Sequence, residues 1–177
     1  MIGRTPPYRS ENAEGNEPMG DTLARIASVL EYDGLGDLLR YWQLVGHGGV
    51  PARADIEPAD IPKLLSNIIL IDVQRAPIRF RARLCGTEVD RLLGRNFTGC
   101  YLDDMTIGYF ERDILLDYAE VVLHKRPKVA RRSILAANGN WLRYQRLLLP
   151  LSSDGWAVDK LLGAVYGQCA ADVRGAA

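Results

Sequence analysis

The first part of the chain has apolar side chains spaced three and four residues apart, which is typical of amphipathic helices. The segment "DTLARIASVL" (21–30) predicts one short helix with Asp21 as its N-cap. After Gly34, "LGDLLRYWQLVG" (35–46) predicts a second helix. Its apolar stripe consists of Leu35, Leu38, Leu39, Trp42 and Val45.

The spacing then changes to the alternation expected of β-strands. The β-branched run "SNIILIDV" (66–73) predicts one strand, and "IRFRARLCG" (78–86) predicts a second by strict alternation. That alternation places Phe80, Ala82 and Leu84 on one face. It places Arg79, Arg81 and Arg83 on the other.

A longer helix is predicted between these two strands and three later ones. In "YFERDILLDYAEVVLHKRP" (109–127) a stripe that includes Tyr118 and Val122 predicts a helix that ends before Pro127. The later strands are expected in "KVARRSILAA", "WLRYQRLLLPLS" and "KLLGAVYGQC", with "NGN" (138–140) as a hairpin turn. This order predicts an α+β fold, an antiparallel sheet with helices on one face.

The same patterns divide the chain into four parts. Residues 1–19 carry too little apolar surface to fold and predict a disordered tail. Residues 20–46 hold the N-terminal helices, residues 47–170 form the main domain, and residues 171–177 are a second tail.

Composition excludes several classes of protein. The 22 Lys and Arg residues balance 22 Asp and Glu residues, so no basic field favours nucleic acid as a partner. No apolar run is long enough to insert into a membrane, and no leader is evident at the N-terminus. The three cysteines are widely spaced, which favours a reducing compartment and a cytoplasmic location. Neither their spacing nor that of the two histidines predicts a metal site.

The chain resembles the PAS domain superfamily, in particular a group of short, stand-alone bacterial PAS-like proteins of mostly unknown function. The resemblance lies in "RYWQLVGHGGVPARADIEPADIPKLLSNIILIDV", "FRARLCGT", "GRNFTGCYLDDM" and "RLLLPLSSDG…LLG", over about residues 37–168. It implies a five-stranded antiparallel sheet of spatial order 2-1-5-4-3, a cavity between the sheet and its helices, and regulatory rather than catalytic work.

Flavin and haem are the cofactors that this resemblance raises, and we expect neither. Light-sensing PAS domains have a cysteine directly after "GRN", whereas this chain has Phe97 there and Cys100 three residues later. The glutamine that such domains place in the last strand is replaced by Ala164, Val165 and Tyr166. Haem-binding members use a histidine on the long helix, but His124 falls in its last turn, near solvent.

No nucleophile elbow or glycine-rich phosphate loop is present, so we do not expect an enzyme. The glycines of "LCGTEVDRLLGRNFTG" instead turn the chain: Gly86 ends a strand and Gly94 ends a helix. Asp103 and Asp104 are adjacent and are expected to cap a turn or helix rather than to act as an acid and base.

Three sets of residues are candidates for function. The PAS-like cavity would be lined by Leu84, Tyr118, Val122 and Leu149, and a small molecule bound there could modulate the protein. Alternatively, Arg79, Arg81 and Arg83, with Arg131, Arg132, Arg143 and Arg146, could bind an anionic ligand or nucleotide messenger. The competing interpretation is that arginines on edge strands prevent pairing between molecules.

The third set is the stripe of Leu35, Leu38, Leu39, Trp42 and Val45, which a helix of about 11 residues must bury to be stable. We expect it to pair across a homodimer, with Trp42 as its anchor. The sequence thus predicts a non-catalytic bacterial signalling protein that acts through contacts with an unidentified signalling partner.

Overall fold

The computed structural model describes residues 17–104, 112–135 and 141–169. The two tails, apart from Glu17, Pro18 and Met19, and the expected turn at 138–140 lie outside these ranges. The helices are α1 (Met19–Val29), α2 (Asp33–Gly46), α3 (Thr87–Leu93) and α4 (Arg112–His124). The strands are β1 (Ile68–Arg75), β2 (Ile78–Cys85), β3 (Lys128–Leu135), β4 (Trp141–Leu151) and β5 (Lys160–Cys169). Three short 3-10 turns occupy Arg53–Asp55, Pro58–Asp60 and Leu65–Asn67.

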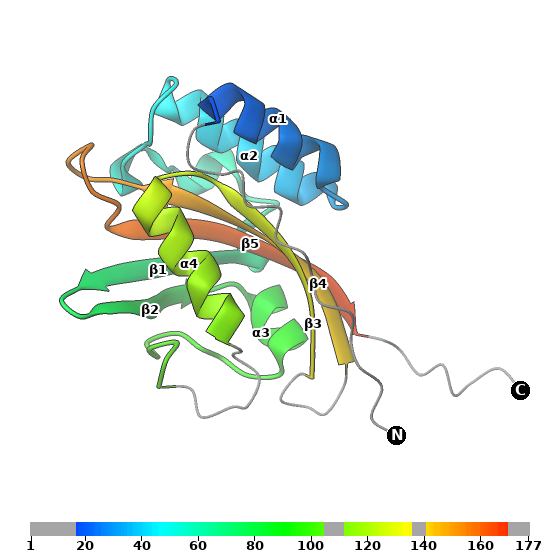
Figure 1. The fold of residues 1–177 in the computed structure, drawn as a ribbon. Coiled ribbons are helices and arrows are strands. Elements are labelled where there is room, and N and C mark those ends of the chain that lie inside the picture. The colour runs from blue at the N-terminus through cyan, green and yellow to red at the C-terminus, as the bar shows by residue number, and fades with distance from the viewer. Residues whose placement is uncertain (1–16, 105–111, 136–140, 170–177) are drawn as a thin grey trace, which may run out of the picture.

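The five strands form one antiparallel sheet in the order β2-β1-β5-β4-β3. This confirms the predicted order. In Figure 1, α4 crosses one face of the sheet, and the pair α1 and α2 lies at its other side. We call the face that packs against α3 and α4 the inner face, and the face that packs against α1 and α2 the outer face.

Strand β4 is buried on both faces because it lies inside the sheet, between two helical layers. Leu142 and Leu148 belong to the inner core, together with Tyr118 and Val121 of α4. Leu147, Leu149 and Leu151 belong to the outer core, together with residues of α2. An odd-numbered residue of β4 therefore faces outward, and an even-numbered one faces inward.

Helix α2 buries its apolar stripe against its own sheet. Leu35, Leu38, Leu39 and Trp42 are buried and Val45 is partly buried, all in the outer core. The Nε1 atom of Trp42 donates a hydrogen bond to the carbonyl oxygen of Pro150 at 2.9 Å. The stripe is thus buried within one chain while α2 stays docked, and the homodimer expected from the sequence stays a prediction.

The alternation of β2 is not strict, which corrects a second expectation. Leu70 of β1 pairs with Leu84, but the next residue, Ile71, pairs with Ala82, so Arg83 is an extra residue in β2. Such a bulge reverses the faces of the residues beyond it. Leu84 is consequently 45% exposed, and Cys85 packs against the inner core.

The outer edge of β2 is covered by the chain that follows α3. The backbone N–H of Ala82 donates to the carbonyl of Cys100 at 2.9 Å, and that of Leu102 donates to Phe80 at 2.8 Å. This edge strand is therefore blocked by backbone pairing as well as by its arginines.

Gly86 and Gly94 turn the chain as predicted. A Cβ atom at Gly86 would collide with the backbone carbonyls of Leu65 and Ser66. Gly94 has φ of 77°, and its N–H closes α3 by donating to the carbonyl of Asp90.

Helix α1 begins at Met19 rather than after Asp21, the N-cap expected from the sequence. Within the described ranges, no helix is long and apolar enough to cross a bilayer.

Candidate functional site

A buried arginine lies on the inner face of the sheet, in the strand that contacts both helical layers. Arg146 is 3% exposed and sits between two inner-facing residues of β4, Tyr144 and Leu148. Its cross-strand neighbours are Ala130 of β3 and Val165 of β5, both buried. A charge in such apolar surroundings needs a charged or hydrogen-bonding partner, because its desolvation is costly.

Asp117 of α4 is the charged partner of Arg146. The Nη2 atom of Arg146 donates to Oδ2 of Asp117 at 2.7 Å, and Asp117 is itself 4% exposed. Arg132 of β3 donates to the same oxygen at 2.8 Å. The Nζ atom of Lys128 lies 3.4 Å from the other oxygen, Oδ1. One carboxylate on α4 therefore joins the helix to two strands.

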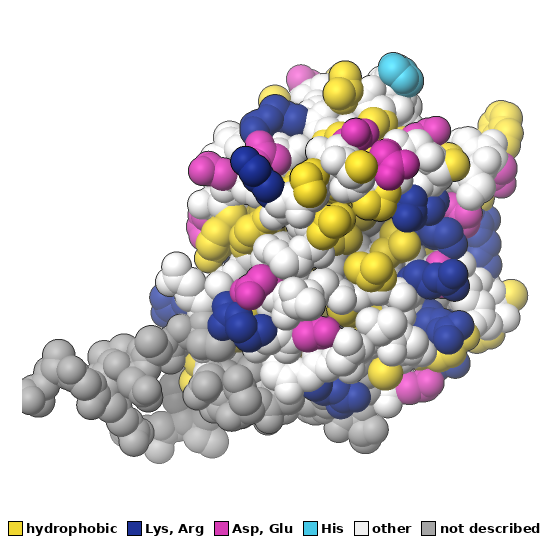
Figure 2. Space-filling view, turned by 180° about the vertical axis from the view of Figure 1, so that it is seen from behind, with side chains coloured by type: hydrophobic (Ala, Val, Ile, Leu, Met, Phe, Trp, Pro, Cys, Tyr) yellow, Lys and Arg dark blue, Asp and Glu magenta, His cyan; other side chains and the backbone are white. Residues whose placement is uncertain are grey.

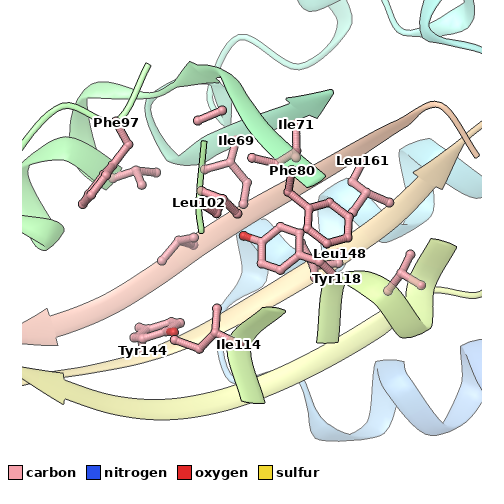
Figure 3. Packing of buried hydrophobic residues seen from close by; sticks show 14 of the residues in the cluster. Ile69, Ile71, Phe80, Phe97, Leu102, Ile114, Tyr118, Tyr144, Leu148 and Leu161 are labelled. Atoms are coloured by element: carbon pink, nitrogen blue, oxygen red, sulfur yellow. The ribbon is translucent and has the colours of Figure 1, made fainter. Parts of the chain in front are cut away.

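The guanidinium of Arg146 also covers an aromatic ring of the same helix. Its Cζ atom lies 4.6 Å from the centroid of Tyr118, and the Tyr118 ring packs at 5.4 Å from that of Phe80. Figure 3 shows Tyr118 and Phe80 side by side in the inner core, with Ile114 and Tyr144 nearby. Burial raises the pKa of the Tyr118 hydroxyl, which keeps this phenol neutral.

The electrostatics hold Arg146 in its charged form. Burial lowers the pKa of Arg146, but Tyr118, Tyr144 and Asp117 outweigh it and raise the pKa above the ordinary value. The Nε atom of this guanidinium is buried and has no hydrogen-bond partner in the described part of the chain. The site thus combines a permanent charge with a donor that no described residue uses.

The neighbouring residue, Gln145, performs the corresponding task on the outer face. Its side chain is 1% exposed. Its Nε2 donates to the carbonyl of Val29 at 2.8 Å, and its Oε1 accepts from the N–H of Glu31 at 2.9 Å. Arg131 adds a hydrogen bond to Val29 and an ion pair with Glu31. The link between α1 and α2 is therefore fastened to β4.

The family model described as "PAS domain" matches residues 32–166, which is most of the chain. This chain belongs to the PAS domain family. The match begins before α2 and ends in β5, so it takes in the second N-terminal helix as well as the sheet. A comparison with curated proteins found no match.

Solved PAS-type structures resemble the fold at low identity. A light-oxygen-voltage (LOV) protein of Rhodobacter sphaeroides has a TM-score of 0.48 and 15% identity, over 63% of this chain and 68% of that one. The PAS domain of a protein from Colwellia psychrerythraea has a TM-score of 0.47 and 12% identity, over 63% of this chain and 96% of that one. Both are resemblances of fold.

The residues that follow the "GRN" sequence pack at the inner core. Phe97, which takes the place of the reactive cysteine, is buried in the inner core. Cys100 packs against that core from the segment that covers β2. On β5, Val165 faces inward, whereas Ala164 and Tyr166 pack with the outer core, so no amide stands there.

His124 is the last residue of α4 and is exposed, as the sequence predicts for a residue in the final turn. Among the described residues, no group of three His, Cys, Asp or Glu side chains could hold a metal ion.

The four expected cavity residues do not meet. Tyr118 is buried in the inner core, and Val122 packs against it. Leu149 lies on the opposite face, in the outer core, and Leu84 is turned out by the bulge at Arg83. Of the four expected residues, only Tyr118 and Val122 of α4 therefore lie at the inner face.

The arginines of β2 each contact a different acceptor. Arg79 is bound to both Asp103 and Asp104 and lies 4.0 Å from the centroid of Tyr101. The Nε atom of Arg81 donates to the carbonyl of Gly99 at 3.2 Å. Arg83 is 3.9 Å from Asp72. Figure 2 shows Lys and Arg side chains along one flank of the molecule with acidic side chains beside them. The structure does not bring these arginines together on one acceptor.

The sequence offers Arg146 as one of seven candidate arginines. It does not predict that this residue lies at the centre of the inner face. A signal was available in "YQRLLLPL" (144–151), where the apolar run shows that β4 is covered on both faces. An arginine that adjoins such a run is a candidate for burial.

Proposed function

We propose that this PAS family protein is a non-catalytic signalling protein that acts through contacts with another protein and is modulated by a small molecule at the inner face. Membership of the family supports a signalling or sensory role. The arrangement of β4 and the helices on either side of it supports the protein contacts and the modulation by a small molecule.

The observation that carries the proposal is the opposite use of two consecutive residues. Arg146 points inward and binds Asp117 of α4, whereas Gln145 points outward and binds the backbone between α1 and α2. A ligand that alters the position of α4 would act on the same strand that fastens the N-terminal helices. Because interfaces of packed elements tend to have discrete arrangements, a small shift at one face can change the other.

The adjacent residues Asp103 and Asp104, and Asp117 of α4, are engaged in structural contacts. Hydrogen bonds from Arg79 lower the pKa of Asp103, which keeps that carboxylate ionised and makes it a poor general acid. Asp104 is bound to Arg79 as well, and Asp117 is held by two arginines. These contacts support a binding function.

The test is purification of the tagged full-length chain from its own host, followed by mass spectrometry of the native complex. We expect a near-stoichiometric protein partner with the wild type. Gln145→Ala should change the recovery of that partner several-fold, because it frees the link between α1 and α2. Arg143→Ala is the matched control, since Arg143 is exposed on the same strand. A wild type that elutes alone under every growth condition contradicts the proposal.

A further inference from the structure

The Nε–H group of Arg146 is a hydrogen-bond donor without an acceptor among the residues that the structure describes. It is buried, and no described residue accepts from it. An unsatisfied buried donor on a charged group costs more than a neutral one, so native structures keep few of them. Such a donor on the inner face of a binding fold indicates a missing acceptor.

The bond to Asp117 does not remove this requirement. It engages Nη2, and Asp117 accepts from Arg132 through the same oxygen. A guanidinium carries five N–H groups in a planar fork that can bind two carboxylates on different edges. The buried edge that carries Nε therefore retains a donor that a second carboxylate oxygen could accept from.

The surroundings restrict the remainder of such a molecule. Ala130 and Val165 lie directly across from Arg146 on the two adjoining strands, and Leu148 is next to it on the same face. All three are buried and apolar. The ring of Tyr118 lies against the guanidinium. Apart from the hydroxyl of Tyr118, these groups offer no partner to a second charge or a strongly polar body, whereas an alkyl or aryl body would bury apolar surface.

We propose that the inner face beside Arg146 binds an organic monocarboxylate with an apolar body, and that its carboxylate accepts from Nε of Arg146. This rests on the proposed function, since it names the class of small molecule that modulates the protein. It also places the anion among the inner-face residues rather than at Arg79, Arg81 and Arg83. The bound acid would share the guanidinium with Asp117, and so would act directly on the contact that joins α4 to β4.

Phenylacetate and hexanoate are suitable probes, because their amides, phenylacetamide and hexanamide, have the same shape without the charge. Binding to the full-length chain is measured by isothermal titration calorimetry, and each acid is compared with its amide. We expect saturable binding of at least one acid and at least about tenfold weaker binding of its amide, as is typical of hydrogen bonds to charged groups.

Two substitutions at one position keep the test independent of folding. Arg146→Gln removes the charge. Arg146→Lys keeps a cation for Asp117 but lacks the Nε–H group and the fork. We expect the lysine variant to keep a cooperative unfolding transition and to bind the acid at least about tenfold more weakly. Arg143→Gln, on the outward side of the same strand, should bind as the wild type does.

Three outcomes would overturn the inference. They are no saturable binding of either acid to the wild type, equal binding of acid and amide, or wild-type affinity in folded Arg146→Lys. None of them alters the recovery of a partner protein in the purification described above, so failure here is distinguishable from failure of the proposed function.

Discussion

Arg146 and Asp117 form a buried ion pair, 2.7 Å between Nη2 and Oδ2, that joins the centre of the sheet to α4. The two residues are 29 positions apart and are 3% and 4% exposed. Replacing a whole buried pair by apolar residues can be neutral, but removing one partner leaves the other charge uncompensated. The pair therefore makes the docking of α4 sensitive to the state of one side chain.

Asp117→Asn should destabilise the protein by about 3 to 5 kcal/mol, because Arg146 and Arg132 lose a carboxylate that both contact. Urea unfolding followed by circular dichroism gives the free energy. Asp37→Asn is the control: it removes an exposed pair with Arg40 and should change stability by less than about 1 kcal/mol. Equal effects of the two substitutions would refute a special role for Asp117.

Leu38→Asp and Trp42→Asp should lower stability without dissociating an assembly. Both side chains are buried against the sheet of their own chain, and Trp42 also donates to Pro150. A charge there is buried without a partner, so each variant should lose several kcal/mol or fail to fold. Sedimentation beside unfolding is the measurement. A wild-type dimer that becomes a folded, stable monomer in these variants would show that the stripe lies between chains.

The Cys85 thiol should react slowly. Burial, with a smaller contribution from Asp90, raises the pKa of Cys85 to about 11. Near neutral pH its thiolate fraction should be about a hundredfold below that of an ordinary cysteine with a pKa of about 8.5 to 9. Alkylation by iodoacetamide should accelerate about tenfold per pH unit from pH 8 to 10. Mass spectrometry of the modified peptide follows the rate, with the urea-unfolded chain as reference, and rapid modification at pH 8 would contradict the assigned burial.

Gly86→Ala should destabilise the protein by about 1 to 3 kcal/mol, since the new methyl group would meet two backbone carbonyls that cannot move away easily. Gly20→Ala is a matched control in α1, where nothing lies within 4 Å of the added atom. It should leave stability unchanged or raise it slightly. Thermal unfolding of both variants decides the matter, and a silent Gly86→Ala would mean that the turn is looser than described.

The purified protein should be colourless. Phe97 stands where a flavin-reactive thiol would be required, and His124 is exposed at the end of α4. Absorption spectra after gel filtration provide the check. A near-stoichiometric flavin band or a haem Soret band would reject this expectation.

The sequence by itself determined the elements and their order. Apolar spacing along 35–46 identified α2, a β-branched run identified β1, and alternation identified β2. The motifs between residues 37 and 168 identified the PAS family. These features can be predicted from the sequence because helix and strand periods depend on neighbouring residues in the chain. The turns at Gly86 and Gly94 could be predicted for the same reason, since a turn also depends on neighbouring residues.

The tertiary structure alone decided which surfaces meet. A stripe such as that of α2 shows that burial is required, but not whether a sheet of the same chain or a second copy provides it. The bulge at Arg83 reversed Leu84 through pairing with β1, which no local pattern encodes. Arg146 and Asp117 became partners only because α4 packs across β3 and β4, so their charge chemistry depends on docking between segments that are distant in the chain.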